Sequence, residues 1–441
     1  MHTEARENPI YAVVAAVQLP HVTDFEFESS LAELRELAKT LGLQVIHTFV
    51  QKRSGFDTAA YLGAGKRQEI HDFVAGDDGR DIGFILVDHE LSPSQARNLE
   101  LEVGCEVMDR TMVILEIFHR NARSRAARAQ VEIARLGYMA PRLREMAKLA
   151  GSQGRQRGGG GGRGAGESLT ELDRRKIRDR IAELQLEINA MELERKTQRA
   201  RRQGRQGLAR VALVGYTNAG KSTLMRALTG SEVLVANKLF ATLDTTVRVL
   251  HPESVPRVLV SDTVGFIKNL PHGLVASFKS TLDEALDAEL LLHVIDASDP
   301  GFERQLAVTD RVLEEIGADQ VPRLRVFNKI DHAGDAEAQA QHAAALAERY
   351  PGCIVMSARR PDEVARLRQT IVTFFQQDLV EAELFLPWSA QQGRQEIFAQ
   401  CEVLAERADD AGAFFRVRGE AETLDRLRAQ FGEGGDPDMA S

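Results

Sequence analysis

A glycine-rich octapeptide between an apolar run and a helical stretch constrains the fold more than any other feature of this chain. It runs from Gly215 to Ser222 with the spacing Gly-x-x-x-x-Gly-Lys-Ser. Residues 211–215 lead into it as a strand of buried type, and residues 224–228 continue as a helix. Backbone N–H groups of such a loop, together with the helix N-terminus, bind phosphate groups. We therefore predict an α/β domain with a parallel sheet and a phosphate-binding loop.

Side chains in this loop and in a later strand favour magnesium-dependent phosphate chemistry. Lys221 is placed to reach the β- and γ-phosphates of a nucleotide, and the Ser222 hydroxyl is a candidate Mg²⁺ ligand. Residues 257–262 form an apolar strand that ends in Asp262, a carboxylate suited to the shell of the same ion. Three residues later, Gly265 can offer its N–H to the γ-phosphate. The two motifs together predict binding of a nucleoside triphosphate with Mg²⁺.

Residues 326–331 indicate which nucleotide base the site binds. The Asp331 carboxylate can accept from both N1–H and the exocyclic amino group of guanine, whereas adenine presents no such pair of donors. A buried carboxylate left unpaired is costly, so the discrimination is steep. Asn328 is expected to tie this loop to the phosphate loop, with the Lys329 stem along the base. GTP and GDP are therefore the predicted ligands.

A further tripeptide, Ser357-Ala-Arg359, follows an apolar strand at 353–356. Its position predicts a backbone N–H donated to the guanine O6. Each of these short motifs is weak alone. Four motifs in this order, each at the end of a predicted strand, are specific for a nucleotide-binding domain of the GTPase type.

Two features bear on hydrolysis. Residues 240–246 lie where a mobile switch should close on Mg²⁺, and Thr242, Thr245 and Thr246 are all chemically capable of doing so. Spacing alone does not choose among the three. Phe266 follows Gly265 where many GTPases place a glutamine that orients the attacking water. Either a partner completes the catalytic site, which we favour, or another group positions the water.

Residues 1–110 alternate strand-like and helix-like stretches. Apolar runs have strand length and the stretches between them have helical periodicity. The expected strands are 12–19, 43–50 and 82–87, and the expected helices are 31–41 and 93–103. This alternation predicts a small α/β domain with a parallel sheet.

The segment 111–207 contains most of the positive charge. Residues 120–210 hold 23 Lys or Arg and 10 Asp or Glu, although the formal net charge of the chain is −9. Apolar residues at helical spacing flank a glycine-rich stretch, 151–166, which predicts an antiparallel helical hairpin with a basic loop at its tip. Ser168 is expected to cap the second helix. The arginines suit RNA phosphates, and the alternative is a flexible linker between solvated helices.

The end of the chain predicts a small α+β domain at 378–431 and a disordered tail at 432–441. Its expected strands are 383–388 and 413–417, and its expected helices are 394–406 and 423–431. Three cysteines are too few for a disulfide framework or a metal cluster. The first residues lack the pattern of a signal peptide, and no apolar stretch reaches the length of a membrane span. A cytoplasmic protein is expected.

These motifs resemble those of the HflX family of ribosome-associated GTPases, and the resemblance covers nearly all of the chain. In the nucleotide domain it rests on residues 215–222, 239–244, 262–266, 270–282 and 328–331. Ahead of that domain it rests on Asp109-Arg-Thr111, Gln130-Val-Glu132, Pro141-Arg-Leu143 and Asp173-Arg-Arg175. Other GTPases share the motifs of the nucleotide domain but not the motifs that precede it.

The resemblance implies roles that the spacing left open. Ser222 and Thr242 would be the Mg²⁺ ligands, with Asp262 in the second shell. The partner would be the large ribosomal subunit and its rRNA, with the N-terminal region reaching towards the peptidyl-transferase centre, and the activity would split or rescue stalled ribosomes. The protein would then be cytoplasmic and partly ribosome-bound.

Two positions depart from the family pattern. Thr245 stands where the family usually has proline, and Ala165 stands where its loop motif usually has proline. Both changes loosen the backbone of elements that are expected to move.

The predicted fold class is α/β: a P-loop NTPase G domain at 208–377, preceded by a small α/β domain at 1–110 and a helical hairpin at 111–207, and followed by a small α+β domain. The predicted catalytic residues are Lys221, Thr242 and Gly265. The predicted nucleotide-binding residues are Gly215, Tyr216, Thr217, Asn218, Ala219, Gly220, Lys221, Ser222, Thr223, Phe240, Ala241, Thr242, Leu243, Asp244, Asp262, Thr263, Val264, Gly265, Asn328, Lys329, Ile330, Asp331, Ser357, Ala358 and Arg359.

Alternatives to ribosome splitting are a GTP-regulated RNA-binding scaffold and a GTPase that acts in ribosome assembly or RNA modification. RNA modification would need a catalytic cysteine or a cofactor site, and the sequence around Cys401 shows neither. The chain is expected to act as a monomer.

Overall fold

The computed structural model of the chain describes residues 10–76, 81–153, 165–203, 208–230, 239–240, 243, 245–268, 284–377 and 379–431. The chain forms two compact units. The N-terminal unit holds residues 1–192 together with 236–244 and 265–281, and the C-terminal unit holds 193–235, 245–264 and 282–441. The range predicted for the G domain is thus shared between the units, because two of its segments pack with the N-terminal unit.

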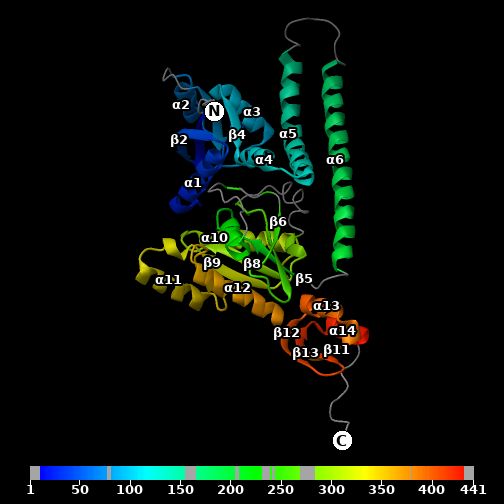
Figure 1. The fold of residues 1–441 in the computed structure, drawn as a ribbon. Coiled ribbons are helices and arrows are strands. Elements are labelled where there is room, and N and C mark those ends of the chain that lie inside the picture. The colour runs from blue at the N-terminus through cyan, green and yellow to red at the C-terminus, as the bar shows by residue number, and fades with distance from the viewer. Residues whose placement is uncertain are drawn as a thin grey trace, which may run out of the picture. The chain divides into compact units, whose positions relative to one another are not determined.

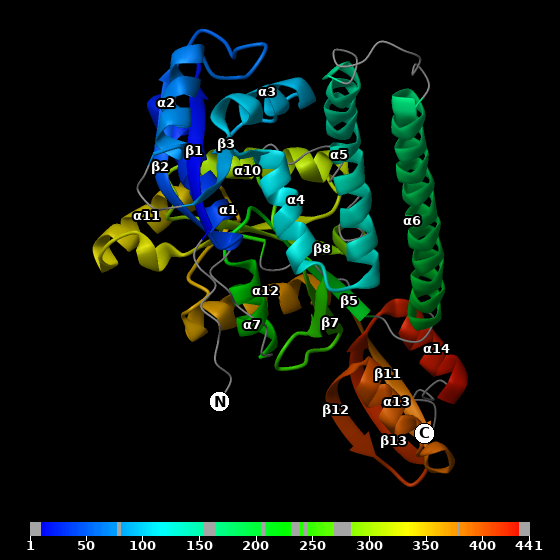
Figure 2. The same ribbon diagram turned by 90° about the horizontal axis from the view of Figure 1, so that it is seen from above.

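A four-stranded parallel sheet with strand order β2-β1-β3-β4 forms the core of the N-terminal unit. Its strands are β1 (Ile10–Gln18), β2 (Leu43–Lys52), β3 (Ile82–Val87) and β4 (Glu106–Asp109). Its helices are α1 (Asp24–Thr40), α2 (Ala64–Val74), α3 (Pro93–Val103) and α4 (Arg110–Asn121). Helix α1 packs on α4, and α2 packs on α3 (Figure 2). The predicted α/β domain with a parallel sheet is confirmed.

Two elements of this sheet domain escaped sequence analysis. Helix α2 buries only Ile70 completely, so its apolar periodicity is weak. Strand β4 has only four residues and forms a strand because it pairs with β3. Both elements depend on tertiary contacts that a local pattern does not contain.

Two long helices follow, α5 (Arg125–Gln153) and α6 (Ala165–Gln203), which lie side by side in both views (Figures 1 and 2). They are antiparallel, because Arg125 pairs with Glu187 at 3.2 Å and Glu132 pairs with Arg180 at 3.1 Å. The predicted hairpin is therefore confirmed. The predicted cap is wrong, because α6 begins at Ala165 and Ser168 lies inside the helix. The glycine-rich residues 154–164 lie outside the described residues.

The C-terminal unit contains a six-stranded sheet with strand order β10-β9-β8-β5-β7-β6. Its strands are β5 (Leu208–Val214), β6 (Thr246–Val249), β7 (Arg257–Asp262), β8 (Leu290–Asp296), β9 (Arg323–Asn328) and β10 (Ile354–Val355). Only β6 is antiparallel to its neighbour. The carboxyl ends of the five parallel strands therefore meet at one edge, which is where ligands bind in open α/β sheets.

Helices cover both faces of this sheet. They are α7 (Lys221–Thr229), α10 (Phe302–Glu315), α11 (Ala336–Arg349) and α12 (Pro361–Gln376), with a single 3₁₀ turn η2 (Ile330–His332) after β9. One apolar core joins α7 and α12 to the sheet, and a second core involves α10 and α11. This arrangement confirms the predicted P-loop fold.

The last described residues form a three-stranded antiparallel sheet, β11-β13-β12, with two helices and a 3₁₀ turn. The elements are β11 (Val380–Pro387), η3 (Trp388–Ala390), α13 (Gly393–Gln400), β12 (Glu402–Ala408), β13 (Gly412–Gly419) and α14 (Ala421–Phe431). The α+β prediction is confirmed. The single helix expected at 394–406 is wrong, because its second half forms the edge strand β12 and pairs with β13. Within the described ranges, no helix is long and apolar enough to cross a membrane.

Candidate nucleotide-binding site

The loop between β5 and α7 requires its two terminal glycines. Gly215 has φ 145°, and a Cβ there would lie 2.2 Å from the Val294 carbonyl oxygen of β8. Gly220 has φ 97°, and a Cβ there would lie 2.2 Å from Nδ2 of Asn328. Any other side chain would therefore push the loop away from β8 and β9. The predicted residues Tyr216, Thr217, Asn218 and Ala219 lie on this loop, and Lys221, Ser222 and Thr223 form the first turn of α7.

Lys221 is a buried cation held by neutral acceptors. Its Nζ donates to the carbonyl oxygens of Gly215 at 3.0 Å and Tyr216 at 2.8 Å, and the residue is 6% exposed. Burial lowers the pKa of this ammonium to about 8, against the attraction of Asp262, which raises it. A phosphate would supply the anionic partner that the carbonyls do not, and would favour the charged form.

Ser222 and Asp262 provide oxygen atoms suited to a hard cation. The Ser222 hydroxyl donates to Oδ2 of Asp262 at 2.7 Å, and Asp262 is fully buried at the end of β7. Mg²⁺ prefers oxygen ligands and usually binds one or two protein groups together with phosphate oxygens and water. This hydroxyl and carboxylate, beside a helix N-terminus, fit that pattern. Among the described residues, no group of three or more His, Cys, Asp or Glu residues could hold a metal ion.

Asn328 joins three loops at the same edge. Its Nδ2 donates to the carbonyl oxygen of Ala219 at 2.9 Å, and its Oδ1 accepts from the N–H of Ala358 at 2.9 Å. The residue is 2% exposed, so both bonds are shielded from water. The predicted tie between this segment and the phosphate loop is confirmed.

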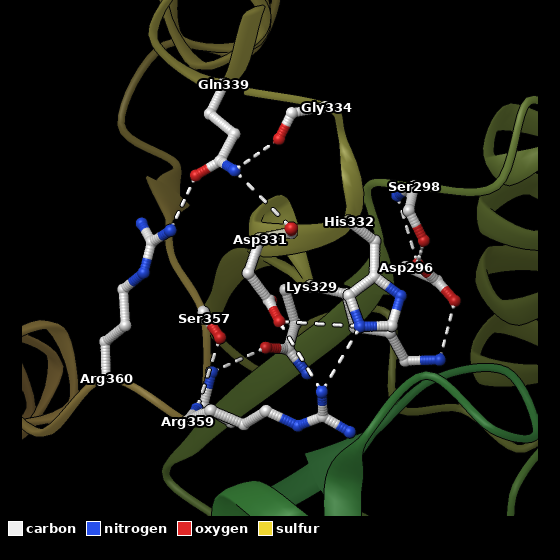
Figure 3. Close-up of polar contacts among 12 residues, drawn as sticks. Asp296, Ser298, Lys329, Asp331, His332, Gly334, Gln339, Ser357, Arg359 and Arg360 are labelled. Carbon is white, nitrogen blue, oxygen red and sulfur yellow. Dashed lines mark hydrogen bonds and ion pairs between the residues drawn. The ribbon is translucent and has the colours of Figure 1, made fainter. Parts of the chain in front are cut away.

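The carboxylate of Asp331 lies at a polar corner drawn in Figure 3. Its Oδ2 lies 3.4 Å from Nε2 of His332 and 3.7 Å from Nη1 of Arg359. Partial burial raises the pKa of Asp331, but the Ser357 hydrogen bond, a backbone N–H, and the nearby His332 and Arg359 lower it further than burial raises it. The side chain is therefore an ionised acceptor, which is the form that recognition of guanine requires.

The backbone N–H groups near Ser357 have partners within the protein. Ser357 N–H donates to Glu363 at 2.6 Å, Ala358 N–H to Asn328 at 2.9 Å, and Arg359 N–H to the Ser357 hydroxyl at 3.2 Å. A bond from this segment to the guanine O6 requires one of these N–H groups to exchange or share its partner. That bond stays a prediction.

Asp296 and His293, both on β8, are not among the residues predicted from the sequence. Asp296 accepts from Nζ of Lys329 at 2.8 Å, and this ion pair holds a lysine whose φ is 63° (Figure 3). Asp296 could have been identified from the sequence, because it lies at the carboxyl end of a strand, as Asp262 and Asn328 do. His293 is 1% exposed, and burial, with help from Arg323, Arg325 and Lys221, lowers its pKa to about 3.

The predicted switch residues are described only in part. Ala241, Thr242 and Asp244 lie outside the described residues, as does the segment 270–282, so Thr242 as a Mg²⁺ ligand stays a prediction. Phe240, Leu243 and Val264 are buried. Phe266 is 1% exposed, and its hydrocarbon ring has no group that could orient a water molecule.

Family models match three consecutive parts of the chain. Residues 28–119 match a GTP-binding GTPase N-terminal domain, 121–202 a GTP-binding GTPase middle region, and 210–329 a 50S ribosome-binding GTPase. Among solved structures, the chain resembles a GTP-binding protein from Sulfolobus solfataricus in complex with GDP. That match has 24% identity and a TM-score of 0.44, and it covers 82% of this chain and 99% of the other.

Curated relatives match nearly the whole length. The GTPase HflX of Gluconacetobacter diazotrophicus is 50% identical over 450 residues, which cover 95% of this chain and 97% of the relative. The GTPase HflX of Escherichia coli strain K12 is 38% identical over 389 residues, which cover 87% of this chain and 86% of the relative. On this likeness and on the site geometry, the chain belongs to the HflX family of GTPases.

Proposed function

We propose that this GTPase acts on the large ribosomal subunit and splits or rescues stalled ribosomes. The observation that carries the proposal is the match of residues 210–329 to the 50S ribosome-binding GTPase model, in a chain whose hairpin is strongly basic. Arginine and lysine side chains along α5 and α6 suit the phosphates of rRNA. The large subunit is thus both the partner and the activator of the enzyme.

Within this proposal, the nucleotide binds at the carboxyl edge of the GTPase sheet. The loop from Gly215 to Gly220 and the N-terminus of α7 bind the phosphates, and Lys221 neutralises charge on the β- and γ-phosphates. Asp331 selects guanine, with Asn328 keeping its loop against the phosphate loop. Ser222 and Thr242 would hold Mg²⁺, with Asp262 in the second shell, and the ion would supply positive charge to the phosphate oxygens.

Hydrolysis transfers the γ-phosphoryl group of GTP to water, and GDP is the leaving group. The water oxygen forms a bond to phosphorus, the bond to the β–γ bridging oxygen breaks, and the water proton ends on the released phosphate. Gly265 contributes an N–H to the γ-phosphate. Since Phe266 is buried and apolar, the water is oriented by another group, and we assign that role to a contact made on the ribosome.

The test is the GTPase rate against the concentration of large ribosomal subunits at low and moderate salt. We expect kcat to rise about tenfold or more with subunits, as when a partner completes a catalytic site. A Lys221→Ala variant gives the background rate. A wild-type rate that subunits leave unchanged at both salt concentrations would refute the proposal and favour a scaffold whose nucleotide only locks a conformation.

Splitting is tested separately, by light scattering of whole ribosomes mixed with the protein and GTP. Deleting residues 158–166 should impair splitting while the affinity for GDP stays within twofold of the wild type. If splitting persists after the deletion, the glycine-rich loop is a linker. If GDP affinity falls as well, the loop contributes to the nucleotide site and its assigned role is wrong.

A further inference from the structure

Two segments of the GTPase sheet lie at the predicted base site, one after β9 with Asp331 and one after β10 with Ser357. The strands that carry them pair only briefly, because β10 has two residues. Beyond the strands, the Ile330 N–H donates to the Met356 carbonyl oxygen at 3.3 Å. Strand pairing therefore ends before it reaches Asp331 and Ser357, and from there the separation of the two segments depends on side chains.

A glutamine on α11 holds the segment that contains Asp331. Nε2 of Gln339 donates to the carbonyl oxygen of Gly334 at 2.7 Å and to that of Asp331 at 3.4 Å. Oε1 of Gln339 accepts from Nη2 of Arg360 at 2.6 Å (Figure 3). Arg360 is the residue that directly precedes α12. This one amide therefore connects the backbone around Asp331 to a guanidinium of the neighbouring segment.

The guanidinium continues the connection to Ser357. Nη1 of Arg360 donates to Oε1 of Glu363 at 3.1 Å, and Oε2 of Glu363 accepts from the Ser357 N–H at 2.6 Å. The Glu363 side chain is 17% exposed, so this carboxylate is largely shielded from water. Hydrogen bonds that involve an ionised group are stronger than neutral ones, and the planar guanidinium fixes their direction. We call Gln339, Arg360 and Glu363 the base bridge.

The base bridge leaves the carboxylate of Asp331 available. It holds this residue by the backbone carbonyl, whereas guanine recognition uses the two carboxylate oxygens. It also occupies the Ser357 N–H, so the N–H groups of Ala358 and Arg359 are the ones left to meet the guanine O6. The contacts of the base bridge are therefore compatible with a bound base.

We propose that the base bridge positions the two base-recognition segments so that one guanine ring meets both of them. Guanine is rigid, and its N1–H and amino group have to reach Asp331 while O6 reaches residues 357–359. Segments held in advance at the matching separation lose less entropy on binding. The proposal rests on the proposed role of Asp331 in recognition of guanine. It assigns three positioning residues for nucleotide selectivity, none of which touches the base.

The experiment compares Gln339→Ala and Arg360→Met with the wild type in the full-length protein. Titration with fluorescent GDP gives its Kd, and competition gives the Kd of inosine diphosphate, which lacks the amino group. We expect affinity for GDP to fall about tenfold in each variant, the loss expected for one hydrogen bond with a charged partner. The preference for GDP over inosine diphosphate should shrink about fivefold, because a displaced Asp331 no longer reaches the amino group.

Hydrolysis supplies a second measurement. The base lies away from the γ-phosphate, so kcat at saturating GTP should stay within about twofold of the wild type while KM rises. General destabilisation of the domain would leave the preference between the two nucleotides unchanged. An unchanged preference in both variants overturns the proposal, whatever happens to the Kd of GDP.

Gln341→Ala is the matched control. Gln341 also lies on α11, but its Nε2 donates to Glu337 of the same helix at 3.3 Å. Both Kd values should equal those of the wild type, and an equal loss of preference in this variant overturns the proposal.

The double variant Gln339→Ala/Arg360→Met tests whether the residues act as one unit. Since each single change already breaks the base bridge, the double variant should lose about tenfold in GDP affinity, as each single variant does. A loss of about 100-fold, the product of two independent effects, contradicts a common bridge.

Asp331→Asn in the same assay separates this proposal from the proposed function. If Asp331→Asn keeps the wild-type preference, Asp331 does not read the base, and a reduced preference in Arg360→Met still supports the base bridge through residues 357–359. If Asp331→Asn loses the preference and Arg360→Met keeps it, the base bridge has no positioning role and the proposed base site stands.

Discussion

The chain contains one parallel sheet and one sheet in which five of six strands are parallel, and the carboxyl edges of the two differ in their buried charges. At the edge of the N-terminal sheet, Asp88 and Asp109 are buried and held by side chains of the protein itself. Their partners are Ser30, Arg110, Tyr138 and Arg142. At the edge of the GTPase sheet, Lys221 is buried and donates to backbone carbonyls of a glycine-rich loop, and the buried Asp262 accepts from the Ser222 hydroxyl.

This difference shows what turns a sheet edge into a ligand site. Burying a carboxylate is costly, and a guanidinium from the same protein offsets that cost. The buried carboxylates of the N-terminal edge therefore already have positively charged partners. The Lys221 ammonium donates to neutral carbonyl oxygens, so these hydrogen bonds can be exchanged for bonds to a phosphate, and the glycines let a phosphate approach the backbone. The same architecture therefore joins elements of the fold in one case and binds phosphate in the other.

The largest loss of nucleotide affinity should come from adding a side chain to the glycine-rich loop of the GTPase sheet. In Gly220→Ala, the new Cβ would lie 2.2 Å from Nδ2 of Asn328 at a φ of 97°, so Asn328 must leave the phosphate loop. We expect affinity for GDP to fall about 1000-fold or more, roughly 4 kcal/mol. Titration with fluorescent GDP measures it.

Gly104→Ala is the matched change on the N-terminal sheet. Gly104 ends α3 with φ 74°, but a Cβ there meets nothing within 4 Å. The variant should lose about 1 kcal/mol of stability and bind GDP as the wild type does. Equal GDP affinities of the Gly220 and Gly104 variants would show that the close approach to Asn328 does not matter.

The next effect concerns the base. Asp331→Asn replaces one acceptor oxygen by a donor, so guanine loses a bond while xanthine, which carries an oxygen in place of the amino group, gains one. We expect affinity for GDP to fall about 100-fold, roughly 3 kcal/mol, and affinity for xanthosine diphosphate to rise. Competition between the two nucleotides reports the change. Unaltered preference for guanine would remove Asp331 from base recognition.

On the N-terminal sheet, Asp88→Ala should destabilise without touching nucleotide binding. Asp88 accepts from the Ser30 hydroxyl at 2.6 Å and from Arg110 at 2.9 Å, and its loss leaves a buried guanidinium with one carboxylate fewer. We expect the free energy of unfolding to fall by about 2–3 kcal/mol. Urea unfolding with and without GDP separates the effects. A loss of GDP affinity would mean that the two edges are not independent.

The residues at the edge of the GTPase sheet could be predicted from the sequence more fully than those at the edge of the N-terminal sheet. Asn328 was predicted to reach the phosphate loop because its role is encoded in a short motif, and the bond to Ala219 confirms it. The contact of Phe118 with Phe240 could not be predicted, because the two residues lie far apart in the chain and belong to different predicted domains.

Edge strand β12 shows the same limit on a smaller scale. Its alanine and glutamate residues are typical of helices, so the local pattern continued the helix that precedes it. Only pairing with β13 makes these residues a strand, and pairing is a tertiary property. Local patterns therefore located most elements and the phosphate loop, whereas contacts between distant segments determined the rest.

The last effect is a pH dependence of the stability of the GTPase sheet. His293 is buried on β8 between β5 and β9, and its folded pKa is about 3, far below the ordinary value near 6.5. The unfolded chain therefore binds a proton below about pH 6.5 that the folded chain does not. The stability contributed by neutral His293 is complete above that pH and is lost as the pH falls towards 3.

Between pH 7 and pH 5 this amounts to about 2 kcal/mol, since the pH then lies about 1.5 units below the unfolded pKa. His293→Gln removes the titrating group and should reduce the pH dependence of unfolding by that amount. Urea unfolding followed by far-UV circular dichroism at the two pH values measures the change. Identical differences between pH 7 and pH 5 in wild type and variant would mean that His293 is protonated in the folded sheet, with Asp310, 3.7 Å away, as its counter-ion.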